Sequence, residues 1–341
     1  MAERILSQRE LNRATLARQL LLRRARLPVV RAVERVAGLQ AQIGSTPYVG
    51  LWTRLDGFRR SSLEQALKRR TVSRGVLMRG TVHLVSTSDY GLFGTALEVA
   101  SPGWVTPDAE EIARQVAASL REYAAEPRTR VEILEWLERE HGIVSDGTAR
   151  VWYAIRLEAR IAHAPEASLW KAPAQGARFV AVEYDEREGR AARAEFVRRY
   201  LAAFGPATRA EIAGWSGMKV GAFSDVLDGL RRLRDDRGRE LFDLPRAPLP
   251  GADAPAPVRF LPKFDNVLLD RARVLPEEYR KLIVRKNADV QPTFTVDGLA
   301  AGVWRVERDR VVTEPFAPLP RTVRRELDDE AARLERWLSN D

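Results

Sequence analysis

Two stretches of this chain repeat each other in register, and the repeat limits the possible folds more than any other feature. One reads Thr-Arg-Val-Glu-Ile-Leu-Glu-Trp from Thr129, and the other reads Thr-Arg-Ala-Glu-Ile-Ala-Gly-Trp from Thr208. Each threonine stands three residues before a glutamate, the capping-box spacing, and the isoleucine and tryptophan share one helical face. Gly142 and Gly217 end these helices, and a second periodic segment follows each. Each copy therefore predicts a helix, a turn and a helix.

Strand-like segments follow both helix pairs. After the first pair, residues 168–171 and 178–182 have strand composition and are separated by proline and glycine. After the second pair, a tight turn at residues 237–239 leads into a strand over residues 240–244. A helix-turn-helix followed by a β-hairpin is the plan of a winged helix.

The N-terminal part of the chain fits the same plan and would be a further module of this kind. Around His83, strand alternation places Val82 and Leu84 on one face and His83 on the other. The expected helices lie near residues 9–22, 28–40 and 62–70, and the expected hairpin runs through residues 75–85.

The C-terminal part of the chain has a different pattern. Residues 245–258 are rich in proline and alanine, which suits an exposed, semi-extended connector. Asp297 and Gly298 are expected to form a turn, and residues 321–338 carry apolar side chains at helical spacing. The β-type segments are residues 259–261, 293–296 and 302–306.

These patterns predict an α+β fold, with three tandem winged-helix modules followed by a β-rich C-terminal segment and a closing helix. A chain with several built-in DNA-binding modules has no need to dimerise, so a monomer is expected. The expected modules are residues 1–100, 101–190 and 191–250, and the C-terminal segment is residues 251–341.

The charge of the chain favours a polyanionic partner. The formal net charge is +9, and arginine supplies most of the positive charge, since only six lysines occur. This balance fits DNA binding. It fits equally well an arginine-rich composition with solvated helix faces, so motifs must decide between the two.

Composition also excludes several classes of site. The chain has no cysteine, which excludes disulfides, thiolate metal sites and a cysteine nucleophile. His83, His141 and His163 lack the close spacing of a helical zinc site, so neither a metal nor another cofactor is expected. No stretch approaches the roughly 18 consecutive apolar residues of a bilayer span, so we expect no membrane association and a cytoplasmic, nucleoid-associated protein.

Two glutamines interrupt an apolar helical pattern near residue 40. Val29, Val33 and Val36 define an apolar face whose next position is Gln40, where an aliphatic side chain would pack more favourably. Gln42 falls on the opposite side of an ideal helix, so the two amides converge only if the helix ends near Gln40. Periodicity alone favours the plain interpretation that both amides cap and solvate a helix C-terminus.

The stretch Leu39-Gln40-Ala41-Gln42, with Tyr48-Val49-Gly50-Leu51-Trp52 after it, resembles the AlkZ-like winged-helix DNA glycosylases. Further similarity to this family covers residues 78–85, 262–269, 296–298 and 302–304. The matches are separated from one another and span most of the chain.

The resemblance implies an activity and its residues. In this family a glutamine, apolar residue, glutamine motif is the catalytic element, here Gln40-Ala41-Gln42, and the related AlkX branch carries aspartate in the last position. The resemblance implies a concave DNA-binding surface and a monofunctional glycosylase that excises N-alkylated purines from double-stranded DNA. Bulky genotoxin adducts and crosslinks, in self-resistance or base excision repair, are further candidate substrates.

Amide side chains suit this reaction. Alkylation at N7 or N3 leaves a purine cationic, so the base is already a good leaving group and needs no general acid. A glutamine oxygen can accept a hydrogen bond from the attacking water while its nitrogen holds a sugar or phosphate oxygen. Gln40 and Gln42 would position that water jointly, and such an enzyme would act poorly on normal or neutral damaged bases.

Seven further residues are candidates for DNA contact. Arginine and lysine would neutralise phosphates, and asparagine could bond to sugar or base edges. Asp265 would repel phosphate and so more plausibly orients an arginine, and a lone histidine such as His83 is more often structural. The candidates are Arg79 and His83 near the first hairpin, and Lys263, Asp265, Asn266, Arg271 and Arg273 after the connector. A C-terminal hairpin with Arg305, Arg308 and Arg310 would either probe a groove or serve solubility.

Two non-catalytic functions stay open at the level of sequence. A winged-helix transcriptional regulator would bind DNA at specific sequences through base-edge contacts. A protein that sequesters a DNA-damaging metabolite would protect cells without forming abasic sites. A glycosylase instead predicts base release and a steep, sequence-tolerant salt dependence of DNA binding.

Overall fold

The computed structural model describes residues 4–97, 105–144, 149–173, 175–185, 187–268, 273–286 and 289–340. Helices and short sheets are mixed along the chain, so the predicted α+β class is confirmed. The α-helices of these residues are α1 (Gln8–Arg18), α2 (Val29–Arg35), α3 (Thr46–Arg54), α4 (Arg60–Lys68), α5 (Thr87–Leu97), α6 (Pro107–Tyr123), α7 (Arg130–His141), α8 (Ala149–Glu158), α9 (Gly189–Phe204), α10 (Arg209–Ser216), α11 (Arg280–Ile283) and α12 (Arg321–Asn340).

The strands form three sheets. The first has the order β2-β4-β3-β6-β7-β5, the second β1-β8-β9 and the third β10-β11-β12-β13. The strands are β1 (Ile5–Leu6), β2 (Leu39–Gln40), β3 (Val72–Val76), β4 (Val82–Ser86), β5 (Arg128–Thr129), β6 (Ile161–His163), β7 (Arg178–Ala181), β8 (Arg231–Asp235), β9 (Glu240–Asp243), β10 (Arg259–Leu261), β11 (Thr293–Val296), β12 (Leu299–Glu307) and β13 (Arg310–Pro315).

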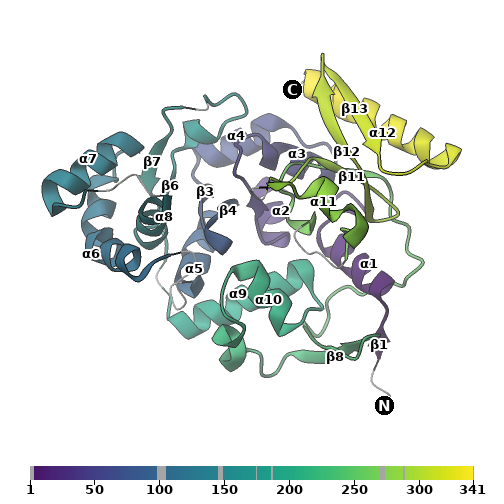
Figure 1. Cartoon of the computed structure of the whole chain (residues 1–341), viewed down its shortest axis with the longest axis horizontal. Helices are drawn as coiled ribbons and strands as arrows, with labels where there is room; N and C mark the ends of the chain where they lie inside the picture. Colours follow the sequence, from purple (N-terminus) through teal and green to yellow (C-terminus); the bar gives the residue numbers. More distant parts are fainter. Residues whose placement is uncertain are drawn as a thin grey trace.

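Two of these sheets cross the module boundaries expected from the sequence. β3 pairs antiparallel with β6, with Arg74 opposite His163, so the six-stranded sheet joins the first expected module to the second. β1 pairs parallel with β8, and this pairing joins the N-terminal segment to the third expected module. Figure 1 shows α6, α7 and α8 at one end of the molecule, β12, β13 and α12 at the other, and β3 and β4 between them.

Local signals in the repeat correctly predicted the helix ends. Thr129 and Thr208 each accept a hydrogen bond from the backbone N–H three residues ahead, and the glutamate there bonds back to the threonine N–H at 2.7 Å. Gly142 (φ 65°) and Gly217 (φ 83°) end α7 and α10 in the left-handed conformation that favours glycine. Both capping boxes and both glycine stops are therefore confirmed.

The predicted strand over residues 168–171 is wrong. A 3-10 helix occupies Pro165–Ser168 instead. The strand that forms the hairpin with β7 is β6, which ends just before this 3-10 helix. The side chain of Trp170 instead packs edge-on against Tyr48, with ring centroids 5.4 Å apart, and under the Arg60 guanidinium at 4.2 Å. These contacts with α3 and α4 outweigh the β-propensity of the segment.

Two arginine–aspartate pairs are completely buried and link distant parts of the chain. Arg18 of α1 donates to both carboxylate oxygens of Asp243 in β9, at 2.7 and 3.0 Å. Arg54 of α3 donates to both oxygens of Asp265 at 2.8 Å. Bidentate geometry of this kind fixes the orientation of both partners, so each pair sets how two segments pack.

A third buried carboxylate, Asp89 in α5, lacks such a partner. It is 1% exposed, and its nearest cation is Arg199, whose Nη2 lies 3.3 Å from Oδ1. Burial raises the pKa of Asp89 to about 6, against the opposing effect of Arg199. The folded chain therefore binds this proton more tightly than the unfolded chain, and the corresponding stability is lost as pH rises from about 4 to about 6.

Replacement of Asp89 by asparagine is therefore expected to stabilise the fold at neutral pH. Two pKa units correspond to at most about 3 kcal/mol, so we expect the free energy of unfolding at pH 7.5 to rise by about 1–3 kcal/mol. Urea titrations at pH 4.5 and pH 7.5 would measure this, with the gain expected only at the higher pH. An equal gain at both pH values would show that ionisation is not its cause.

Candidate active site

The motif Gln40-Ala41-Gln42 lies directly after a sharp helix end. α2 stops earlier than expected, so the helix predicted over residues 28–40 is wrong in its last part. Ala37 (φ 56°) and Gly38 (φ 86°) are both left-handed. Their N–H groups donate to the carbonyls of Glu34 and Val33 at 3.2 and 2.9 Å, which is a Schellman motif. The chain leaves this turn as β2, antiparallel to β4.

The side chain of Gln40 is held by an arginine. Gln40 is 7% exposed, and its Oε1 accepts a hydrogen bond from Nη2 of Arg79 at 3.1 Å. A guanidinium can only donate, so the amide oxygen must face Arg79 and the nitrogen must point elsewhere. The Gln40 nitrogen has no hydrogen-bond partner in the part of the chain that the structure describes.

The side-chain oxygen of Gln42 takes the place of a backbone carbonyl as a hydrogen-bond acceptor in the sheet. The Ala41 N–H donates to the Val82 carbonyl at 2.7 Å, but the Ala41 carbonyl accepts from Nε of Arg74 at 2.9 Å. The Val82 N–H donates instead to Oε1 of Gln42 at 2.9 Å. This bond fixes the amide orientation, and among the described residues the Gln42 nitrogen also lacks a partner.

Arg79 and His83 complete the surroundings of Gln40. Nδ1 of His83 lies 3.0 Å from the Thr81 carbonyl, which can only accept, so Nδ1 carries the proton and Nε2 accepts from Arg79 at 3.3 Å. Burial, and then the charge of Arg79, lower the pKa of His83 to about 3, so the imidazole is neutral at physiological pH. His83 is fully buried and supports the surroundings of Gln40, and contact of its side chain with DNA stays a prediction.

Arg79 is a cation without a carboxylate partner among the described residues. It adopts a left-handed backbone (φ 57°), and its side chain donates to the Trp215 carbonyl as well as to Gln40. Burial lowers the pKa of Arg79 to about 10, which still leaves it protonated at neutral pH. Arg79 therefore positions Gln40 and brings positive charge to the motif.

A cavity of about 480 Å³ lies beside Gln42. Its walls are mostly cationic or aromatic, and no carboxylate of the described residues lines it. The residues that line it come from α8, the start of α7 and the strands β3, β4, β6 and β7, and from the segments around Gln42 and Gly176. The side chains that matter for chemistry are Gln42, Arg74, Arg130, Trp152, Tyr153, Arg156, His163 and Phe179.

Three predicted DNA contacts lie in the interior instead. Asp265 is 3% exposed and pairs with Arg54, in line with its expected role of orienting an arginine. Asn266 is 1% exposed, and its Nδ2 donates to the Gly38 carbonyl at 3.0 Å. Arg273 is 2% exposed and donates to backbone carbonyls, including that of Phe204 at 2.8 Å. Asp265, Asn266 and Arg273 therefore support the fold, and direct DNA contact by them stays a prediction.

The remaining basic candidates differ in position. Lys263 is partly exposed, and its Nζ lies 2.6 Å from Oδ1 of Asp289. Arg271 lies outside the described residues. The predicted C-terminal hairpin is confirmed, because β12 pairs with β13 and Arg308 (φ 48°) lies in the turn between them.

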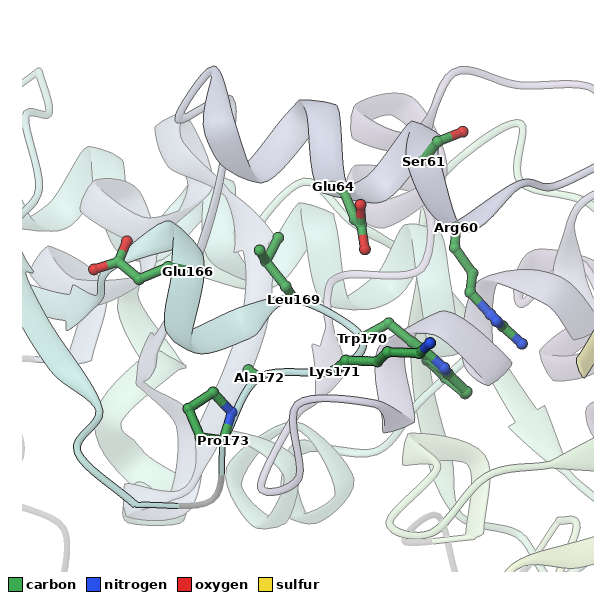
Figure 2. Close-up of a pocket in the computed structure, with 9 residues that line it drawn as sticks. All are labelled: Arg60, Ser61, Glu64, Glu166, Leu169, Trp170, Lys171, Ala172 and Pro173. Carbon is green, nitrogen blue, oxygen red and sulfur yellow. The ribbon is translucent and has the colours of Figure 1, made fainter.

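A second hollow, of about 420 Å³, lacks the motif. Figure 2 shows side chains of α4 on one side of it and the segment around Trp170 on the other. Glu64 and Glu166 line it and would repel a DNA phosphate, so we do not assign it to DNA chemistry. Its lining residues are Arg60, Ser61, Glu64, Glu166, Leu169, Trp170, Lys171, Ala172 and Pro173.

Sequence reasoning missed the two buried arginines beside Gln42. Arg74 interrupts the strand Val-Ser-Arg-Gly-Val, and Arg156 interrupts an otherwise apolar run in α8. A charged residue inside a buried element is the signal that could have found them, because a charge is rarely buried unless it is paired, and neither element offers an obvious acidic partner.

The described residues contain neither a candidate metal cluster nor a membrane-spanning helix. No group of three or more histidine, aspartate or glutamate side chains among them could hold a metal ion. None of their helices has both the length and the hydropathy needed to cross a bilayer.

Comparisons with known proteins agree on one family. A family model described as DNA glycosylase AlkZ-like matches residues 33–337. A relative from Streptomyces sahachiroi, named interstrand DNA cross-link repair glycosylase, is 27% identical over 336 residues, which cover 89% of each chain. The solved structure of Streptomyces sahachiroi DNA glycosylase AlkZ aligns with a TM-score of 0.78 and 24% identity, over 98% of this chain and 97% of that one.

These matches confirm the resemblance found in the motifs. The structural likeness shows that the folds agree over nearly the whole length of both chains. The family match covers most of this sequence, including Gln40-Ala41-Gln42 and the segment from Lys263 to Asn266. The chain belongs to the AlkZ-like family of DNA glycosylases.

Proposed function

We propose that this glycosylase hydrolyses the N-glycosidic bond of cationic, N7- or N3-alkylated purines in duplex DNA, including purines joined in interstrand crosslinks. The activity named for the relative from Streptomyces sahachiroi supports the crosslink part. The observation that carries the proposal is the pair of motif amides, whose oxygens are fixed by obligate donors while their nitrogens have no partner among the described residues.

The chemistry needs positioning more than acid or base. The bond between C1′ and the base breaks with its electron pair going to the base, which neutralises the cationic purine. Water then bonds to the oxocarbenium carbon and releases a proton to solvent. Each amide oxygen has a second lone pair for that water, and each amide nitrogen can donate to a sugar or phosphate oxygen. Gln40 and Gln42 are held in place for this by Arg79 and the Val82 N–H.

The surroundings of Gln42 also limit the substrates. No carboxylate of the described residues lines the adjoining cavity, so no strong general base is present there. Without such a base, hydrolysis depends on a leaving group that is already activated. This supports selectivity for cationic adducts over normal or neutral damaged bases.

We propose in addition that the repeated units are winged-helix modules and that the chain acts as a monomer without metal or cofactor. α7, α8 and the β6–β7 hairpin would form one module, and α10, the 3-10 helix Val220–Val226 and the β8–β9 hairpin another. α2, α4 and the β3–β4 hairpin would form the first. The matching capping boxes of α7 and α10 support this assignment.

Base release from defined duplexes tests the proposal. A duplex with one 7-methylguanine should be cleaved at that position by mild alkali after incubation with the chain, because an abasic site has formed. A duplex with a single crosslink between N7 atoms of two purines should separate into its strands, and undamaged or 8-oxoguanine duplexes should stay intact. Sequence-specific binding without abasic sites would instead identify a DNA-binding regulator.

A further inference from the structure

The cavity beside Gln42 contains a buried cation that nothing in the described structure neutralises. Arg156 is 3% exposed, and burial lowers its pKa to about 10, so it stays charged at neutral pH. Its guanidinium stacks 4.5 Å from the centre of the Phe179 ring, and its Nε has no hydrogen-bond partner. No carboxylate pairs with it among the residues the structure describes.

Among the described residues Arg156 has one hydrogen-bond contact, and its geometry is poor. Its Nη2 lies 3.3 Å from Nδ1 of His163, but the same Nδ1 lies closer, 3.0 Å, to the carbonyl of Arg74. Nδ1 cannot donate to a carbonyl and accept from a guanidinium in the same tautomer. Burial, and then the charges of Arg74 and Arg156, hold the pKa of His163 well below its usual value, so protonation does not resolve this conflict. Because the shorter contact makes Nδ1 of His163 a donor to the Arg74 carbonyl, Nδ1 cannot serve as an acceptor for Arg156.

Two other features add positive potential to the same cavity. Arg74 is 7% exposed and donates to the carbonyls of Ala41, Ala167 and Gln42, so a second buried guanidinium is fixed at the wall. The first turn of α7 also borders the cavity, and the N-terminus of a helix attracts anions.

The carboxylate of that first turn does not neutralise the cavity. Glu132 accepts hydrogen bonds from the N–H and hydroxyl of Thr129 at 2.7 and 2.8 Å, and it does not line the cavity. An uncompensated buried charge is costly, so a protein that keeps Arg156 and Arg74 together is expected to bind an anion there.

We propose that this cavity binds one phosphodiester of the DNA strand that carries the target nucleotide, with Arg156 and Arg130 as its ligands. The inference rests on the proposed function, because Gln42 lines the same cavity and would meet the sugar next to that phosphate. Arg130 is exposed at the start of α7 and reaches the cavity from solvent, whereas Arg156 lies at its aromatic wall. Tyr153, which is partly exposed, provides a flat surface for the sugar or a neighbouring base.

Salt dependence of binding gives the first test. Affinity for a duplex with a stable tetrahydrofuran abasic-site analogue is measured from 50 to 200 mM salt for the unaltered chain and for Arg156→Gln. One phosphate contact contributes about 0.9 to the slope of log affinity against log salt, so the variant should lose about that amount. Arg156→Lys should keep most of the slope. Arg128→Gln is the matched control, because Arg128 stacks on Tyr123 in the same region but does not line the cavity.

Neutral phosphate substitution gives the decisive test. Methylphosphonates are placed one at a time on either side of the abasic analogue. One position should weaken binding of the unaltered chain about tenfold and that of Arg156→Gln less than twofold. If Arg156→Gln does not fold by circular dichroism, Arg130→Gln is used in its place, since its side chain is exposed. Identical methylphosphonate profiles for the unaltered chain and a folded variant would overturn the proposal.

Two further outcomes separate related ideas. Competition by inorganic phosphate at constant ionic strength, together with identical methylphosphonate profiles, would mean a free-anion site that DNA does not use, and would also overturn the proposal. These measurements follow DNA binding and not base release. If the methylphosphonate effect depends on Arg156 but no base is released, only the proposed function is overturned. If base is released but the methylphosphonate effect does not depend on Arg156, only the assignment of the cavity is overturned.

Discussion

Gln42→Ala is expected to release 7-methylguanine from duplex DNA on the order of 100-fold more slowly than the unaltered chain, and Gln40→Ala to show a loss of similar size. The physical reason is that preorganised dipoles at the site of reaction stabilise the transition state more than equivalent groups in water do. Single-turnover release with excess protein would measure the chemical step directly.

Isosteric variants separate the two ends of each amide. Gln42→Glu keeps an acceptor for the Val82 N–H, and Gln40→Glu keeps one for Arg79, but both remove the donor nitrogen. If the nitrogens hold substrate oxygens, these variants should lose activity while keeping the fold. Gln65→Ala, on the exposed face of α4, is the matched control and should release base at the normal rate. Normal release by all four variants at the motif would end the catalytic assignment.

Asp265→Asn is expected to lower the free energy of unfolding by about 3–5 kcal/mol, the largest effect on stability that we predict. The variant leaves Arg54 charged and 1% exposed, with no carboxylate to replace the two 2.8 Å bonds. Chemical denaturation followed by tryptophan fluorescence would measure the loss.

The double variant Arg54→Met with Asp265→Leu distinguishes a lost charge pair from lost packing. Removing both charges avoids an unpaired buried cation, so most of the lost stability should return. Arg26→Gln breaks the exposed pair with Asp56 and should leave stability nearly unchanged. A double variant as unstable as Asp265→Asn would show that charge compensation is not the reason for the loss.

Local signals predicted much of the fold. The capping boxes at Thr129 and Thr208, the glycine stops and the Asp297-Gly298 turn depend on contacts within a few residues, so the sequence contains all the information they need. The hairpin of β3 and β4 and the final helix α12 follow from the two periodicities of apolar residues.

The surroundings of the motif could not be predicted in the same way. The helix before Gln40 ends at Arg35 and is followed by Ala37, a non-glycine residue with positive φ that no local rule anticipates. Arg156 meets Phe179 and Arg74 meets Ala41 only after β3, β6 and β7 have assembled. The family resemblance identified the glutamines, whereas the cations around them are a product of tertiary structure.

The hydrogen bond from Asn266 to the Gly38 carbonyl has a consequence for protein synthesis. The turn before Gln40 accepts a hydrogen bond from the side-chain amide of a residue 228 positions later, next to the Arg54 partner Asp265. The ribosome must therefore translate Asn266 before this hydrogen bond can form. A nascent chain that ends before Asn266 would present both glutamines without this hydrogen bond to the preceding turn.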